Sequence, residues 1–306
     1  MIEMKFNLAE TLERINRKVI YLTVAVAVAL PIIVNFYVPP AEIPTANLLF
    51  DVIEKLPQNT NQIVLFSTDW GPGTSAENLP QTEAVIEHLL RRKIPFALIT
   101  NYAYGTPFMK SVPEAVVKKL KAEDPSKDYI YGKDWVNLGF RPGGGVFLQG
   151  LARSTNWHEM LIADERGTPL KDIPAFAAVK SIKNVALLVE VTGLVGVFGN
   201  WIQYFQSAEY RPPFVHGCTS ITIPEAHNYL ASGQIVGLLE GGAGAAWYEN
   251  LLNKGYPQRT IGTALKVNTS LAVAHLVIIF FIFCANFGVI STIVKKILPN
   301  PKGVSA

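Results

Sequence analysis

Four side chains that could take part in catalysis lie in or directly after apolar segments: Asp69, Glu190, His216 and Cys218. His216 and Cys218 are two residues apart, so in a strand they share a face, and a histidine base can activate a cysteine nucleophile. A reactive thiolate also needs a cation or a helix N-terminus to lower its pKa. The spacing identifies no Asn or Asp that would orient the histidine. We therefore favour a small buried Cys218 over a nucleophile.

Asp69 ends the apolar stretch "QIVLFSTD", where haloacid-dehalogenase-type phosphatases carry a nucleophile. Their motif needs a second acid two residues later, and this chain has Gly71 there. The favoured interpretation is that Asp69 caps the Gly-Pro-Gly loop at 71–73 or bonds its backbone.

Glycine-rich and cysteine patterns argue against a bound cofactor or metal. The stretch "RPGGGVFLQG" around Gly143 to Gly145 lacks the Lys-Ser/Thr of a phosphate-binding loop and the spacing of a dinucleotide fingerprint. It predicts a turn that runs into a helix, with no bound nucleotide. The two cysteines, Cys218 and Cys284, predict no disulfide, and no Cys/His cluster has the spacing of a zinc site.

The elements that must position these residues alternate between strand and helix. Short apolar runs predict strands at 62–69, 94–102, 134–140, 184–193 and 213–223. Apolar residues at helical spacing predict helices at 46–56, 77–93, 111–124 (Ser111 as cap, Pro113 near the start), 143–154, 173–183 and 200–210. Buried strands alternating with helices indicate a three-layer α/β domain, Rossmann-like or flavodoxin-like, with about five mainly parallel strands. Ligands of such sheets bind outside the carboxyl ends of the strands, so the four candidates define a possible pocket there.

Both ends of the chain are strongly apolar. No charged residue occurs from 19 to 41 or from 267 to 294, and about 20 apolar residues suffice to cross a bilayer. We expect transmembrane helices at 19–38 and 267–294 in the cell membrane, with the α/β domain at 39–265 between them. A cleaved signal peptide is the alternative for the first run, which is longer than a typical signal core.

The charged residues that flank the two apolar runs predict the orientation of the chain in the membrane. Basic residues precede the first run and follow the second: Lys5, Arg14, Arg17, Lys18, Lys295, Lys296 and Lys302. Positive flanks stay in the cytoplasm, which places segments 1–18 and 295–306 there and the domain outside. Residues 39–265 hold 19 Lys and Arg against 21 Asp and Glu, so nothing points to a nucleic-acid partner.

Small residues in "GLLEGGAGAAWYENLL" indicate an interface rather than a ligand loop. If the stretch is one helix, Gly237, Gly241 and Ala245 recur every four residues, with Gly244 and Trp247 beside them, and such a face lets another backbone approach closely. One alternative is a turn at Gly241 followed by a helix from residue 243. Another is that the face packs against the domain's own sheet.

The second apolar run carries three polar residues on one helical face: Asn268, His275 and Asn286. Polar groups at membrane depth face protein, so we expect a homo-oligomer or other membrane subunits as partners in the lipid bilayer. The alternative is that His275 and Asn286 find partners within the chain's own helix pair.

The motifs "TDWGPGTSAEN" and "GGAGAAWYENLL", between an N-terminal and a C-terminal membrane helix, resemble a group of uncharacterised prokaryotic membrane proteins. The resemblance implies an envelope protein that works with other membrane subunits, and it implies no activity. The sequence therefore favours a non-enzymatic scaffold subunit of a membrane complex. The alternatives are an envelope hydrolase that uses the strand-end pocket and a solute-sensing domain.

Overall fold

The computed structural model of the protein describes residues 15–58, 60–206 and 209–297. Contacts divide the chain into two units, each described by itself. One is the central domain Pro39–Leu265, and the other joins Met1–Val38 to Lys266–Ala306. The predicted domain boundary at 39–265 agrees with this division.

The central domain contains a sheet of six parallel strands in the order β3-β2-β1-β4-β5-β6. The strands are β1 (Ile63–Asp69), β2 (Phe96–Thr100), β3 (Trp135–Phe140), β4 (Val185–Thr192), β5 (Phe214–Cys218) and β6 (Gly237–Glu240). This is the order of Rossmann-type doubly wound sheets rather than of flavodoxin-like ones. Five strands were predicted, and the sixth lies in the glycine-rich stretch that was interpreted as helix.

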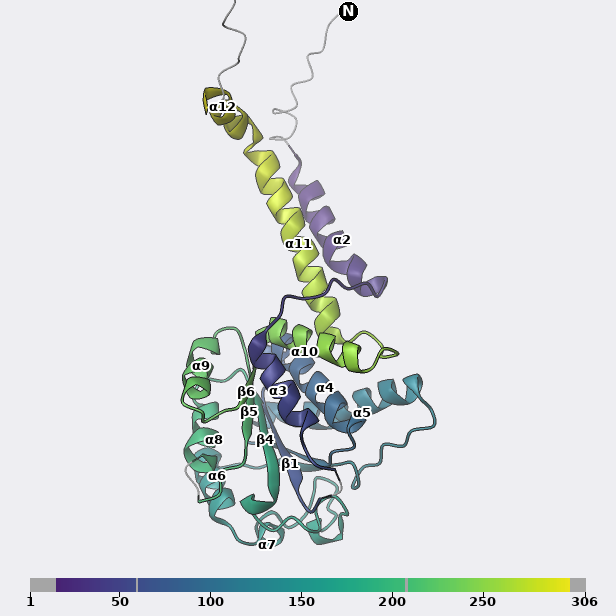
Figure 1. The fold of residues 1–306 in the computed structure, drawn as a ribbon, viewed down its shortest axis with the longest axis vertical. Coiled ribbons are helices and arrows are strands. Elements are labelled where there is room, and N and C mark those ends of the chain that lie inside the picture. Colours follow the sequence, from purple (N-terminus) through teal and green to yellow (C-terminus); the bar gives the residue numbers. More distant parts are fainter. Residues whose placement is uncertain (1–14, 59, 207–208, 298–306) are drawn as a thin grey trace, which may run out of the picture. The chain divides into compact units, whose positions relative to one another are not determined.

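Helices cover both faces of the sheet, as Figure 1 shows. One face carries α3 (Pro44–Glu54), α4 (Ser75–Arg91), α5 (Thr106–Glu123) and α10 (Gly241–Gly255). The other carries α6 (Gly144–Arg153), α7 (Trp157–Leu161), α8 (Val197–Phe205) and α9 (Ile223–Ala231). Alternate residues of β1 supply the two cores, because successive strand residues point to opposite faces. The three-layer α/β prediction is confirmed.

Three predicted elements differ from the structure. Helix α5 begins at Thr106 rather than near Ser111, so Pro113 lies inside it. Residues 173–183 form turns and short 3₁₀ segments, because their buried apolar residues recur every three positions: Ile173, Phe176, Val179 and Ile182. The strand predicted at 213–223 ends at Cys218, and α9 follows.

The second unit contains α2 (Arg17–Ile33), most of α11 (Thr263–Ala285) and α12 (Phe287–Ile297). Within the described residues, only α11 is long and apolar enough to cross a membrane. Helix α2 has 17 residues, fewer than a span usually needs, and the run predicted at 267–294 is interrupted at Asn286. A pair of flanking spans is thus not supported. Most of the predicted segments 1–18 and 295–306 lies outside the described residues.

Candidate functional site

The structure brings the four candidate residues together at the carboxyl ends of β1, β4 and β5. Asp69, Thr192 and Cys218 lie level across the three strands, and Ser67, Glu190 and His216 form the row two residues earlier. All six side chains are buried, and α8 contacts two of them: Phe198 stacks on the His216 ring at 3.8 Å between centroids, and Trp201 donates to Asp69. The predicted convergence is therefore confirmed, but it produces a closed polar cluster rather than an open pocket.

Asp69 accepts four hydrogen bonds although it has no exposed surface. Its donors are Ser67 Oγ (2.7 Å), Thr100 Oγ1 (3.0 Å), the main-chain N–H of Asn101 (2.6 Å) and Trp201 Nε1 (2.9 Å). Burial raises the pKa of the carboxyl, and these hydrogen bonds partly oppose the shift. None of the donors belongs to the loop at 71–73, so the predicted bond to that loop is wrong. Asp69 joins the ends of β1 and β2 to α8 instead.

Glu190 and His216 form a buried pair without a neighbouring cation. Nδ1 of His216 lies 2.6 Å from Glu190 Oε2 and 3.1 Å from the Glu190 main-chain oxygen, with which it forms the hydrogen bond. Within the described residues, neither carboxyl oxygen of Glu190 has a hydrogen-bond partner. Burial and the nearby Asp69 raise the pKa of Glu190 well above its usual range, and burial lowers the pKa of His216 to about 3. Both shifts favour the neutral form of the side chain.

Cys218 is arranged as a structural residue. Its Sγ donates to the main-chain oxygen of Leu239 at 3.6 Å, and burial raises the pKa of the thiol to about 12. In the described part of the chain no hydrogen bond joins it to His216. A thiol with this pKa is not a nucleophile at neutral pH.

A shallow hollow of about 300 Å³ lies above this cluster, beside the point where the strand order reverses. It is lined by the β1–α4 turn, two tyrosines after β2 and Leu194 after β4: Gly71, Pro72, Gly73, Thr74, Tyr102, Tyr104 and Leu194. The turn has the spacing G-x-G-x-x-A from Gly71 to Ala76, which resembles the dinucleotide fingerprint. However, β2 is followed by Asn101 instead of the acid that holds a ribose, and Glu77 occupies the first turn of α4. The spacing is present without the charges that dinucleotide binding needs.

The small residues of 237–247 pack inside the domain. Gly237 belongs to β6, and a Cβ there would lie 2.7 Å from the backbone of Leu49 in α3. Gly241 begins α10 with φ +56, while Gly244 and Ala245 are buried. Trp247 is also buried and donates to Asn47 Oδ1 at 2.6 Å. A single helical ridge through Gly237 is therefore wrong, and the alternative with a turn at Gly241 is closer to the structure.

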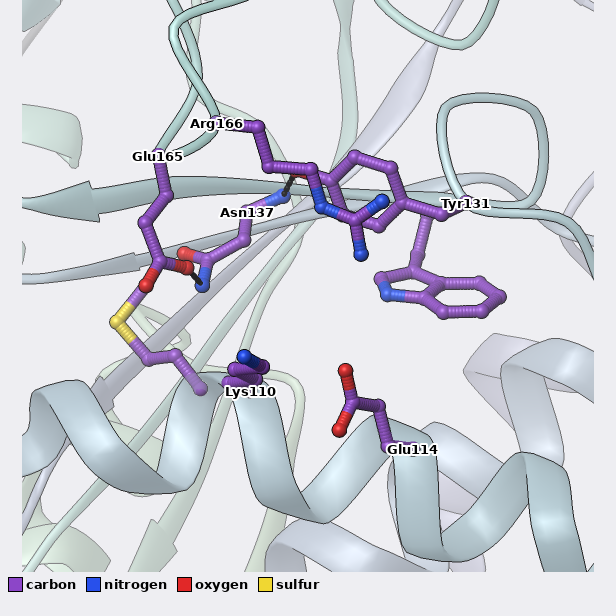
Figure 2. Close-up of a pocket in the computed structure, with 8 residues that line it drawn as sticks. Lys110, Glu114, Tyr131, Asn137, Glu165 and Arg166 are labelled. Carbon is purple, nitrogen blue, oxygen red and sulfur yellow. Dashed lines mark hydrogen bonds between the residues drawn. The ribbon is translucent and has the colours of Figure 1, made fainter.

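A second cavity, of about 340 Å³, lies beside the edge strand β3 and is shown in Figure 2. Its lining is Met109, Lys110, Glu114, Tyr131, Trp135, Asn137, Glu165 and Arg166. Lys110 and Glu114 project from α5 on one side, while Asn137, Glu165 and Arg166 lie opposite them. The sequence did not predict this groove, because its residues come from three segments with no shared motif.

The three polar residues of the second apolar run differ in their surroundings. Asn268 is half-buried, whereas His275 and Asn286 are exposed. Asn286 Nδ2 donates to the main-chain oxygen of Ile282, one turn earlier. In the described part of the chain, His275 forms no hydrogen bond and no ion pair. The alternative in which His275 finds a partner within its own chain therefore has no support.

Comparison with known proteins adds no relative. No protein family, curated protein or solved structure matches this chain. The function is consequently inferred from the geometry of the closed cluster, the groove beside β3 and the exposed histidine of α11.

Proposed function

We propose that this protein is a non-enzymatic scaffold subunit of a membrane complex, with its α/β domain outside the membrane. The observation that carries the proposal is His275. It is the thirteenth of the 23 residues of α11, it is exposed, and among the residues that the structure describes it has no hydrogen-bond or ion-pair partner.

A histidine at this position needs a protein neighbour. A 23-residue helix extends about 35 Å, so residue 275 lies near the middle of a ~30 Å hydrocarbon core. Polar side chains at that depth are unfavourable against lipid and usually face other helices. Since the described residues of the chain offer no partner, we infer that the neighbour is a second copy or another membrane subunit.

We infer that α2 is a second, shorter anchor. After Lys18 it contains no charged residue and only one polar residue, Thr23, and the following residues 34–38 are apolar except for Asn35. A short span is accommodated by local thinning of the bilayer or by packing against other helices. Arg17 and Lys18 then place the N-terminal side in the cytoplasm, and the domain lies on the extracytoplasmic side.

The closed cluster supports a structural role over a hydrolase. Asp69, Glu190, His216 and Cys218 have almost no exposed surface, and α8 lies over them. A hydrolase needs a nucleophile and base that contact substrate. The cluster instead holds three strands and a helix together.

The test is the particle mass of the full-length protein after gentle detergent extraction, by native mass spectrometry. We expect a mass of several times 33.6 kDa, or co-purifying subunits. His275→Leu should weaken assembly by about 3- to 30-fold, because one interhelical hydrogen bond contributes roughly 0.6–2 kcal/mol in membranes. Ile279→Leu, an exposed position one turn along α11, is the matched control. A wild-type monomer, or equal loss in both variants, would contradict the proposal.

A further inference from the structure

The groove between α5 and β3 carries charges of both signs. Lys110 and Glu114 lie one helical turn apart on α5, and Glu165 and Arg166 are adjacent in the loop opposite them. Within the described residues, none of these four side chains forms an ion pair. Two cations and two carboxylates thus face one cavity (Figure 2).

We propose that this groove binds a free α-amino acid, a ligand with one ammonium and one carboxylate. The ligand carboxylate would be bound by Lys110 and Arg166, and its ammonium by Glu114 and Glu165. The inference goes beyond the assembly proposed above and does not depend on it.

The loop that carries Glu165 and Arg166 is held in place by buried groups. The guanidinium of Arg166 lies 3.4 Å from the centre of the Tyr131 ring, and Tyr131 Oη donates to Asp164 Oδ2 at 2.7 Å. The other oxygen of Asp164 accepts the main-chain N–H groups of Arg166 (2.9 Å) and Thr168 (2.8 Å). The loop and the Arg166 guanidinium are therefore positioned before a ligand arrives, which reduces the entropy cost of binding.

Asn137 supports the acidic side of the groove. It is buried in β3, its Nδ2 donates to Glu165 Oε2, and its Oδ1 accepts the main-chain N–H of Gly139 at 2.9 Å. The second carboxylate oxygen of Glu165 has no hydrogen bond to another described residue, and it is free to accept one from an ammonium.

Size and apolar lining favour a single amino acid. The cavity of about 340 Å³ is at the lower end of the range for ligand pockets, roughly 300–1,000 Å³. Met109 and Trp135 supply an apolar wall at its base, where a ligand side chain can pack.

The charge balance argues against simpler ligands. A lone anion near Lys110 would be repelled by Glu114 and Glu165, and a lone cation would be repelled by Lys110 and Arg166. A metal ion has no support either, since the described residues contain no group of three or more potential ligands. Only a ligand with both charges has a favourable contact for each.

The experiment is isothermal titration of the full-length protein in detergent with each of the common L-amino acids. For the best binder, its N-acetyl derivative and its carboxamide follow. We expect the parent amino acid to bind and each blocked form to bind about tenfold more weakly or worse, because each loses a charge-assisted contact.

Variants locate the site. Lys110→Met and Glu114→Gln should each weaken binding by about tenfold, whereas Lys118→Met, an exposed lysine two turns along α5, should leave it unchanged. All three positions are on the surface, so far-ultraviolet circular dichroism should show intact folds. No binding by any amino acid at about 10 mM would overturn the proposal. So would equal binding of the blocked forms, or equal loss in the Lys118 control.

Discussion

Two polar clusters of the domain each contain a buried glutamate, but under opposite electrostatic conditions. The first contains Asp69, Glu190 and His216 at the carboxyl ends of the strands. The second joins Glu87 of α4 to Arg259, in the segment that precedes α11. Arg259 contacts Glu87 through two nitrogens, Nε at 2.6 Å and Nη2 at 2.9 Å.

The difference between the clusters is the presence of a guanidinium. Burial disfavours ionisation of Glu87, but Arg259, with Lys119 and Arg91, outweighs this effect and holds the pKa at about 2. No cation reaches Glu190, and its pKa rises instead. Burial alone therefore does not determine the charge of a carboxyl, because the neighbouring charges decide it. The following predictions test this contrast.

The largest effect is expected for Glu87→Gln. It leaves Arg259 buried without its bidentate partner, and breaking a buried pair in this way costs about 3–5 kcal/mol. The measurement is urea unfolding at pH 7, followed by tryptophan fluorescence, with the exposed Glu114→Gln as control. An effect as small as that of the control would show that the pair contributes no net stability.

The same variant has a predicted pH dependence. The folded-state pKa of Glu87 is lowered to about 2 from a usual value of 4.5, so its stabilisation is present above pH 4.5. That stabilisation is lost as the pH falls toward 2. The gap between wild type and Glu87→Gln should therefore narrow over this range. A constant gap would contradict the ion-pair explanation.

A smaller effect is expected for Asp69→Asn, about 1–3 kcal/mol. All four groups around Asp69 donate hydrogen bonds to its carboxylate. In the variant, the amide nitrogen of Asn replaces one acceptor oxygen and, as a donor itself, cannot accept these hydrogen bonds. Thermal unfolding of the variant, compared with the exposed Asp172→Asn, measures the difference. Unchanged stability would mean that solvent or a rearrangement compensates.

The smallest effect is expected for Glu190→Gln near pH 4, within about 1 kcal/mol, because the carboxyl is then mostly protonated in both the folded and the unfolded state. The folded-state pKa of Glu190 is raised, so the wild type loses stability as the pH rises above 4.5 toward that pKa. Glutamine carries no such penalty. Between pH 5 and 8, the free energy of unfolding of Glu190→Gln should therefore increase relative to that of the wild type. The opposite trend would show an ionised Glu190.

The local sequence pattern was sufficient to predict the main strands and to predict that the candidate site residues lie close together. β1, β2, β4 and β5 are short apolar runs ended by turn residues, and parallel strands place their carboxyl ends at one edge. β6 was missed because four residues before a glycine-rich helix contain too little periodicity to distinguish strand from helix. Its place in the sheet depends on pairing with β5, a contact that does not appear in local sequence.

The sequence by itself determined the α/β layers, the two apolar ends and the meeting of Asp69, Glu190, His216 and Cys218, because these follow from hydrophobic periodicity and strand direction. Only the tertiary structure decided their chemistry. Trp201 reaches Asp69 across 132 residues and Arg259 reaches Glu87 across 172, so whether a carboxyl is neutral or charged depends on contacts that no local pattern encodes. The groove beside β3 has the same origin, since three separate segments must fold before its charges face one another.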